Sequence, residues 1–114
     1  MVAPAAGAVV LVPFPFSDLS QAKLRPAVVL ADAGRGDWIL CQVTSNPYGD
    51  ARAVPLGEAS FASGSLRSES HARPGKLFTA SRDLMVAQIG RLRPEAHGHI
   101  VEAVVTMLRG NRGR

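Results

Sequence analysis

The residues best suited to chemistry stand at the expected ends of two neighbouring strands. Arg25 directly precedes Pro26 and an apolar run, and Thr44 and Ser45 end the next apolar segment. A guanidinium presents a fixed fork of donors that matches phosphate oxygens and stays charged, and hydroxyls can donate to the same group. Because sites gather at strand ends and in loops, these residues are candidates for a site, and phosphate binding is the chemistry that their types would suit.

A second group of polar residues falls in residues 57–75, a segment rich in Ser and Gly. This composition favours a loop, with a short strand expected at 66–70. The polar side chains that this segment offers are Arg67, Glu69, Ser70, His71 and Arg73. Proton transfer could use Glu69, His71 or Asp18 of the first loop, and the residues by themselves leave that choice open.

Metal and cofactor sites are not expected. His97 and His99 are two residues apart on a predicted helix and so face different sides, and His71 has no cysteine or carboxylate at ligand spacing. The sequence also lacks a Gly-rich phosphate loop and a G-x-S-x-G elbow. The single cysteine, Cys41, excludes an internal disulfide and is expected to be a buried small residue in a reducing compartment.

Charge narrows the class of partner. The formal net charge of +4 is uneven, because residues 1–50 hold three Lys/Arg against four Asp/Glu and residues 51–114 hold ten against five. A polyanion such as nucleic acid would therefore draw mainly on the second half. Three of those cations lie within residues 109–114, a stretch expected to be a solvated tail. The charge alone is therefore weak support for a nucleic-acid partner.

The apolar N-terminus argues against export. It has no positive charge before Lys23, and prolines interrupt it, which is typical of neither a signal peptide nor a membrane span. A cytoplasmic protein without a membrane partner is therefore expected. With 114 residues, 46% of them hydrophobic, the chain is long enough for one domain over residues 1–114. Flexibility is expected in the N-terminus (1–6) and in the basic tail (110–114).

The pattern along the chain predicts short strands followed by one helix. Prolines indicate a loop over residues 13–23, and four aromatic residues are expected in the core: Phe14, Phe16, Trp38 and Phe78. The strands are expected at residues 9–14, 26–31, 38–44, 52–56, 66–70, 76–79 and 85–92. From Pro94 an amphipathic helix follows, closed by Gly110, with one apolar face formed by Ile100, Val101, Val104, Val105 and Leu108. These elements indicate a mainly β protein, a small SH3-like barrel with a C-terminal amphipathic helix.

Three segments and the final helix resemble the MazF/PemK family of toxin ribonucleases over roughly residues 7–110. The segments are GAVVLVPFPFSDLSQAKLRPAVVLAD, ILCQVTSN and SESHARPGKLFTASRDLMVAQIGRL. The most specific feature is Lys-x-Arg-Pro before an apolar strand, followed by a cysteine-containing strand that ends in Val-Thr-Ser. The resemblance implies an SH3-like barrel, a homodimer, metal-independent cleavage of single-stranded RNA without a cofactor, and inhibition by a cognate antitoxin.

The resemblance also implies roles for individual residues. Family members place an arginine at the position of Arg25 and a threonine or serine at Thr44 or Ser45 in the active site. They often carry Glu or His in the first loop, where this chain has Asp18 instead. Asp18 is therefore expected in the catalytic group with Arg25, Thr44 and Ser45, although the general base is not assigned. The residues expected to contact RNA are Lys23, Arg67, Glu69, Ser70, His71, Arg73 and Lys76.

Two other interpretations remain open from the sequence. Arg25 could be a surface cation paired with Asp18, which is how most exposed arginines behave. The whole chain could instead be a non-catalytic SH3-like toxin or binding module that acts on a protein target such as gyrase, because one fold hosts many functions. The pairing of Arg25 with Thr44 and Ser45 favours the ribonuclease, since a protein-binding module does not need it.

Overall fold

The computed structural model describes residues 4–15 and 22–110. Asp18 and Phe16, and most of the two expected flexible ends, lie outside these residues. The strands are β1 (Ala8–Pro15), β2 (Ala22–Gly34), β3 (Asp37–Thr44), β4 (Val54–Leu56), β5 (Phe61–Gly64), β6 (Ser70–Ser81) and β7 (Ala87–Leu92), and the helix is α1 (Pro94–Leu108). Single turns of 3₁₀ helix lie at Glu58–Ser60 and Arg82–Leu84.

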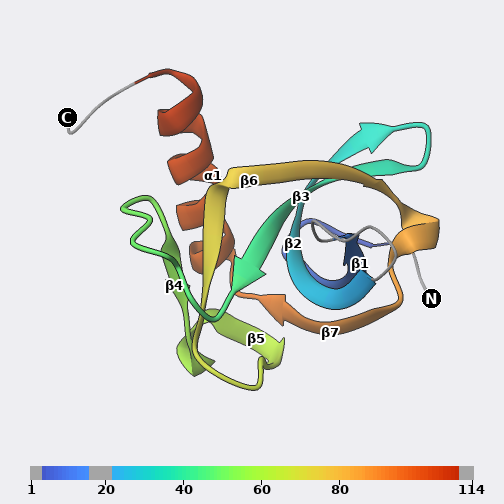
Figure 1. Cartoon of the computed structure of the whole chain (residues 1–114), viewed down its shortest axis with the longest axis horizontal. Coiled ribbons are helices and arrows are strands. Elements are labelled where there is room, and N and C mark those ends of the chain that lie inside the picture. The colour runs from blue at the N-terminus through green and yellow to red at the C-terminus, as the bar shows by residue number, and fades with distance from the viewer. Residues whose placement is uncertain (1–3, 16–21, 111–114) are drawn as a thin grey trace.

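All the described strands belong to one antiparallel sheet. Their order is β4-β6-β3-β2-β1-β7-β5, and the sheet curls into a half-barrel beside α1 (Figure 1). The helix packs against β6 and β4 at one end of the strand order and against β7 near the other end, which the curl of the sheet brings close. The structure therefore confirms the expected class, a mainly β barrel-like fold with a C-terminal amphipathic helix.

The first correction concerns the proline-rich segment 13–23, part of which is strand rather than loop. β7 pairs with β1 only over Ala8–Leu11, so Pro13 lies beyond that ladder. Pro26 likewise lies one residue beyond the β3 ladder, which starts at the pair Ala27↔Gln42. A sheet tolerates a residue without an N–H at such places. β1 therefore extends to Pro15, and β2 begins at Ala22 instead of Pro26.

The second correction concerns residues 57–75. The strand expected at 66–70 is wrong, because the structure has β5 at Phe61–Gly64 and starts β6 at Ser70. Along β6, buried Ser70 and Ala72 alternate with half-buried His71 and Arg73, so this polar segment presents one face to the core. His71 and Arg73 are therefore strand residues rather than loop residues.

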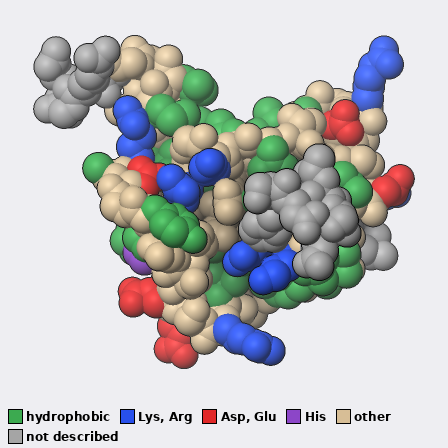
Figure 2. Space-filling model, viewed as in Figure 1, with side chains coloured by type: hydrophobic (Ala, Val, Ile, Leu, Met, Phe, Trp, Pro, Cys, Tyr) green, Lys and Arg blue, Asp and Glu red, His purple; other side chains and the backbone are tan. Residues whose placement is uncertain are grey.

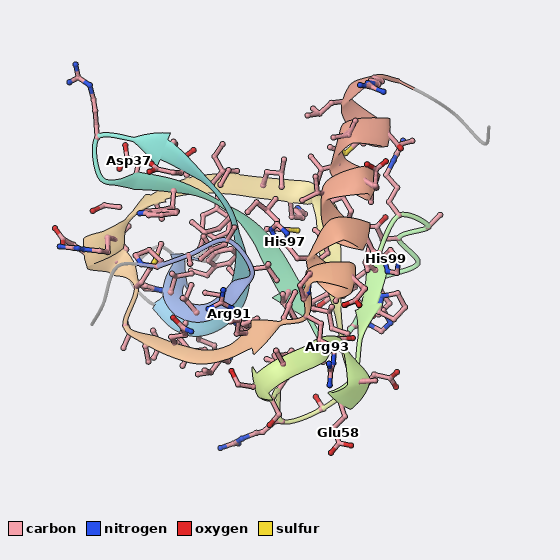
Figure 3. The ribbon with its side chains drawn as sticks, turned by 180° about the vertical axis from the view of Figure 1, so that it is seen from behind. Asp37, Glu58, Arg91, Arg93, His97 and His99 are labelled. Atoms are coloured by element: carbon pink, nitrogen blue, oxygen red, sulfur yellow. The ribbon has the colours of Figure 1, made fainter. Side chains whose placement is uncertain are left out.

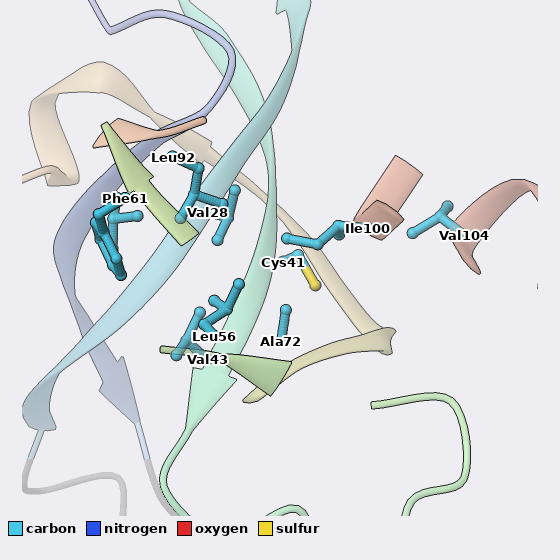
Figure 4. Close-up of a cluster of buried hydrophobic side chains, with 10 residues drawn as sticks. Val28, Cys41, Val43, Leu56, Phe61, Ala72, Leu92, Ile100 and Val104 are labelled. Atoms are coloured by element: carbon cyan, nitrogen blue, oxygen red, sulfur yellow. The ribbon is translucent and has the colours of Figure 1, made fainter. Parts of the chain in front are cut away.

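Two hydrophobic clusters occupy opposite faces of the sheet. Successive side chains of a strand point to opposite faces of the sheet, so neighbouring residues belong to different clusters. Val9 belongs to one cluster, and its neighbours Ala8 and Val10 belong to the other. The first cluster lies under α1, where Ile100 reaches toward the sheet (Figure 4). The residues of the first cluster are Val9, Val28, Cys41, Val43, Leu56, Phe61, Ala72, Leu92, Ile100 and Val104.

The second cluster holds the aromatic side chains. Phe14, Trp38 and Phe78 are partly buried against it, which confirms their expected place in the core. Phe14 and Phe78 meet edge to face, with ring centroids 4.8 Å apart. Cys41, in the first cluster, is buried, also as expected.

The helix α1 follows its sequence signals closely. Pro94 occupies its first turn, and Gly110, at φ 75°, follows the C-cap residue Arg109. Ile100 and Val104 are its buried residues. In the described residues, no helix is long and apolar enough to cross a membrane.

Candidate active site at the ends of β2 and β3

Arg25 and Thr44 stand just beyond the point where the β2–β3 ladder ends. The last pair of that ladder is Ala27↔Gln42, and each of the two residues lies two positions further along its strand. Because side chains two apart share a face, Arg25 and Thr44 project from the same side of the sheet. A depression of about 170 Å³ is lined by both of them. Its lining residues are Arg25, Pro26, Val43, Thr44, Ser45, Leu66, Arg67, Ser68 and Ser70.

The side chains of this depression differ in exposure. Arg25 and Thr44 are half-buried, Ser45 and Arg67 are exposed, and Ser70 is buried. The Thr44 hydroxyl donates to the carbonyl oxygen of Asn46 at 3.0 Å and accepts the N–H of Asn46 at 3.1 Å. Thr44 is thus held in place, and a bound anion would compete with that carbonyl for its proton.

His71 is the proton-transfer candidate that the fold places beside Thr44. The two residues are direct partners in the β3–β6 ladder, so their side chains share a face, with Cβ atoms typically about 4.5–5.5 Å apart. The imidazole is half-buried. Its Nδ1 is buried and has no hydrogen-bond partner among the described residues. His71 therefore lies beside a lining residue of the depression and keeps one ring nitrogen unpaired among the described residues.

The other two proton-transfer candidates have different positions. Glu69 is exposed and lines an adjoining depression of about 370 Å³, which shares Leu66, Arg67 and Ser68 with the first. Asp18 lies outside the described residues, so its relation to the depression stays a prediction.

Arg73 does not line the depression; it contacts two residues of the loop that follows β3. Its Nε donates to Asp50 Oδ2 at 3.0 Å, and its Cζ lies 5.7 Å from the centroid of the Tyr48 ring. The N–H of Arg52, together with the Arg73 side chain, lowers the pKa of the Asp50 carboxyl. The sequence pattern missed this ion pair because its members are 23 residues apart and lie in segments expected to be a turn and a loop.

The Cys41 thiol is unsuited to chemistry at neutral pH. Its Sγ donates to the carbonyl oxygen of Arg73 at 3.1 Å inside the core. Burial raises the pKa of this thiol to about 12. A cysteine nucleophile must be a thiolate, so Cys41 is a packing residue.

Lys76 lines a third hollow, which lies along the face of β3 that carries Gln42 and Thr44. This groove, of about 440 Å³, contains Gln42, which lies two residues before Thr44. Its lining residues are Val12, Pro13, Phe14, Gln42, Lys76, Leu77, Phe78, Thr79, Ala80 and Leu84. Lys23 is exposed on β2, where it pairs with Phe14. Lys and Arg side chains gather near the middle of the face shown in Figure 2.

The histidines of α1 do not join this site. His97 lies on the side of the helix that faces the sheet, and His99 lies on the other side (Figure 3). Among residues 4–15 and 22–110, no three His, Cys, Asp or Glu side chains are placed to hold a metal ion.

Comparisons with solved structures find proteins with a similar fold. The chain is similar to a MazE–MazF crystal structure from Deinococcus radiodurans, with 20% identity, a TM-score of 0.75 and coverage of 98% of this chain and 100% of that one. It is also similar to an endoribonuclease in complex with its cognate antitoxin from a mycobacterial species, with 18% identity, a TM-score of 0.71 and coverage of 96% of each chain. The Mycobacterium tuberculosis toxin MazF-mt6 is similar with 18% identity, a TM-score of 0.65 and coverage of 88% of this chain and 96% of that one.

No curated protein sequence matches this chain. A family model does: residues 5–108 match the PemK-like, MazF-like toxins of type II toxin–antitoxin systems. Since this match spans nearly the whole chain and agrees with the fold, the chain belongs to the PemK-like, MazF-like toxin family.

Proposed function

We propose that this chain is the toxin of a type II toxin–antitoxin pair and acts as a metal-independent endoribonuclease on single-stranded RNA. The observation that carries the proposal is the small depression shared by Arg25, Thr44, Ser45 and Arg67. Two arginines and four hydroxyl residues, Thr44 and Ser45 among them, around about 170 Å³ suit one phosphate group. Pockets for whole small molecules are larger, about 300–1,000 Å³.

The reaction that suits these groups is attack of the ribose 2′-OH on the adjacent phosphorus. The 2′ oxygen forms a bond to phosphorus while the bond to the 5′ oxygen breaks, which gives a 2′,3′-cyclic phosphate and a 5′-OH end. Arg25 stabilises the charge on the non-bridging oxygens, and Thr44 and Ser45 donate to the same phosphate. One group must take the 2′ proton and one must protonate the 5′ oxygen.

His71 is the residue that we propose for one of these proton transfers. Its position opposite Thr44 brings an imidazole to the edge of the phosphate site. Glu69 in the adjoining depression and Asp18 in the first loop are the competing candidates.

The flanking polar residues supply RNA contacts in this proposal. Arg67 and Ser70 line the phosphate site, Glu69 lines the adjoining depression, and Lys76 lines the groove along β3. Lys23 and Arg73 add charge nearby. A cognate antitoxin is proposed as the second partner, supported by the two similar structures that contain a toxin with MazE or a cognate antitoxin.

The test is incubation of the purified protein with mixed single-stranded RNA in EDTA and in magnesium. We expect equal cleavage in both buffers, 2′,3′-cyclic phosphate ends, and no cleavage of RNA with 2′-O-methyl groups throughout. A strict need for added metal, or 5′-phosphate products, contradicts the mechanism. Absence of cleavage together with stable capture of a protein target would favour the non-catalytic interpretation.

The proton-transfer residue is tested by three variants that keep similar shapes: His71→Gln, Glu69→Gln and Asp18→Asn. General acid–base catalysis contributes about 10²–10⁴-fold, so His71→Gln should slow single-turnover cleavage by about 100-fold or more and change its pH dependence. Glu69→Gln and Asp18→Asn should slow single-turnover cleavage much less. A larger loss in either of these two variants would move the assignment to that residue.

A further inference from the structure

Tyr48 is an exposed aromatic residue in the loop that follows β3. Its side chain is 71% exposed, although large hydrophobic residues are usually kept inside. Its backbone has φ 56°, in the left-handed region that disfavours residues with a Cβ. Backbone strain of this kind clusters at ligand-binding and active sites, although turns such as the one at Arg35, with φ 58°, carry it too.

The loop is held firmly around this tyrosine. The Asn46 side chain accepts the N–H of Tyr48 at 2.9 Å, and the Thr44 hydroxyl holds Asn46 in turn. On the other side, Asp50 accepts from the N–H of Arg52 at 2.9 Å and pairs with Arg73. The ring is therefore presented to solvent by a pre-organised segment, which lowers the entropy lost when a ligand binds.

The position of Tyr48 connects it to the candidate active site. Its ring lies over Arg73, which follows His71 by two residues on β6 and so shares its face of the strand. His71 is the cross-strand partner of Thr44. Two steps along a strand cover about 7 Å, so Arg73 and the ring that it contacts lie about one base spacing along β6 from His71, on the side of the loop that follows Thr44.

We propose that Tyr48 is a stacking platform for an RNA base next to the cleaved phosphate. Stacking on an aromatic ring suits any base, and the guanidinium beside the ring adds positive charge for the strand. This inference rests on the proposed ribonuclease function and adds to it a base-binding residue that the catalytic steps do not use. The platform contributes to affinity and leaves the chemical step to Arg25, Thr44 and Ser45.

The experiment compares Tyr48→Asn with Tyr48→Phe. Asparagine tolerates positive φ better than tyrosine, so Tyr48→Asn removes the ring while easing the backbone strain. Tyr48→Phe keeps the ring. Leu108→Ala is the matched control, because Leu108 is also 71% exposed and lies at the end of α1. Melting temperatures check that all variants fold.

The probe is a randomised 12-nucleotide 2′-O-methyl RNA, which has no 2′-OH and so reports binding without turnover. Loss of one base stack corresponds to a Kd raised about fivefold or more, which we expect for Tyr48→Asn but not for Tyr48→Phe or Leu108→Ala. The same RNA with one 2-aminopurine should show fluorescence quenching with the wild type, Tyr48→Phe and Leu108→Ala, but not with Tyr48→Asn.

Three outcomes separate the possibilities. If wild type and Tyr48→Asn bind the probe equally and quench 2-aminopurine equally, the platform is wrong while the ribonuclease proposal stands. If Tyr48→Asn keeps RNA affinity but loses binding to the purified antitoxin, the ring belongs to a protein interface and the platform is wrong. If the wild type neither binds the probe nor cleaves unmodified RNA, the proposed function itself fails.

Discussion

Arg25 combines a fixed charge with a fixed position. Pro26 restricts the backbone next to it, and the following residues of β2 are buried in the sheet. Its side chain is half-buried at the lip of the depression, where water screens its charge less than at an open surface. A guanidinium held this way is pre-organised for a phosphate before the substrate arrives.

The variant Arg25→Lys separates charge from geometry. Lysine keeps the positive charge but loses the planar fork, so RNA binding should remain close to wild type while cleavage slows by about 10²-fold or more. Binding of 2′-O-methyl RNA and single-turnover cleavage measure the two effects, and circular dichroism checks folding. Equal cleavage rates in the two folded proteins would remove Arg25 from the active site.

The buried thiol of Cys41 predicts a loss of stability at alkaline pH. Burial raises the pKa of Cys41 from 9.0 to about 12, so as pH rises the unfolded chain gives up this proton first. Between these two values the unfolded state binds fewer protons, and the free energy of unfolding falls with rising pH. At pH 10 the loss from this group is about 1 kcal/mol relative to pH 7.

Urea unfolding of the wild type and Cys41→Ala at pH 7 and pH 10 isolates this contribution, because every other titrating group is common to both proteins. The free energy of unfolding should fall more between pH 7 and pH 10 for the wild type than for Cys41→Ala. An identical decrease in the two proteins would contradict the raised pKa.

At the scale of elements, the end of β5 depends on close approach to β7. Gly64 pairs with Gly90, has φ 70°, and a Cβ at this position would come within 2.3 Å of the carbonyl oxygen of Ile89. That atom belongs to the backbone, so it cannot move aside easily. The strand pair therefore accepts only glycine at position 64.

Gly64→Ala should destabilise the fold by about 2 kcal/mol or more, from the left-handed backbone and the overlap together. The matched control is Gly57→Ala, because Gly57 has φ −115° and a Cβ there would meet nothing within 4 Å. The control should change stability by about 0.5–1 kcal/mol at most. Chemical denaturation measures both variants, and similar stabilities would show that β5 does not need this contact.

At the scale of the whole molecule, apolar side chains on the outside favour self-association. Leu24, Leu84 and Val86 are each about half exposed, at 50%, 49% and 59%. Leu84 also lines the groove of Lys76, which runs along the face of β3 that carries Thr44. A dimer that covers these side chains would bring a second copy next to the proposed RNA path.

We expect a homodimer with an interface of ordinary size, about 800 Å² per partner. Sedimentation at micromolar concentration should show the dimer mass for the wild type and a shift toward monomer for Leu84→Lys, while Leu108→Lys, at the end of α1, should stay dimeric. A wild-type protein that sediments only as monomer would contradict this expectation.

The sequence alone determined the features that depend on neighbouring residues. Pro94 and Gly110 bound α1 because a proline suits a first helical turn and a glycine suits the left-handed residue after a helix. Apolar β-branched runs predicted most of β1 and β3 and the central part of β2, and so placed Thr44 at a strand end. Arg25, expected just before a strand, lies inside β2, beyond the point where its pairing with β3 ends. These patterns act over a few residues and are therefore readable without the fold.

The tertiary structure decided what depends on pairing between distant segments. Pro13 and Pro26 fit inside the β1–β2 ladder because the ladder on the other side of each strand, with β7 or with β3, stops before them, which is a property of strand order. The β3–β6 register, irregular between Cys41 and Val43, put His71 opposite Thr44. The pairing of Arg73 with Asp50 likewise depended on β6 passing the 45–53 loop. A register or an ion pair between segments more than 20 residues apart is fixed by packing of the whole sheet, and no local pattern encodes it.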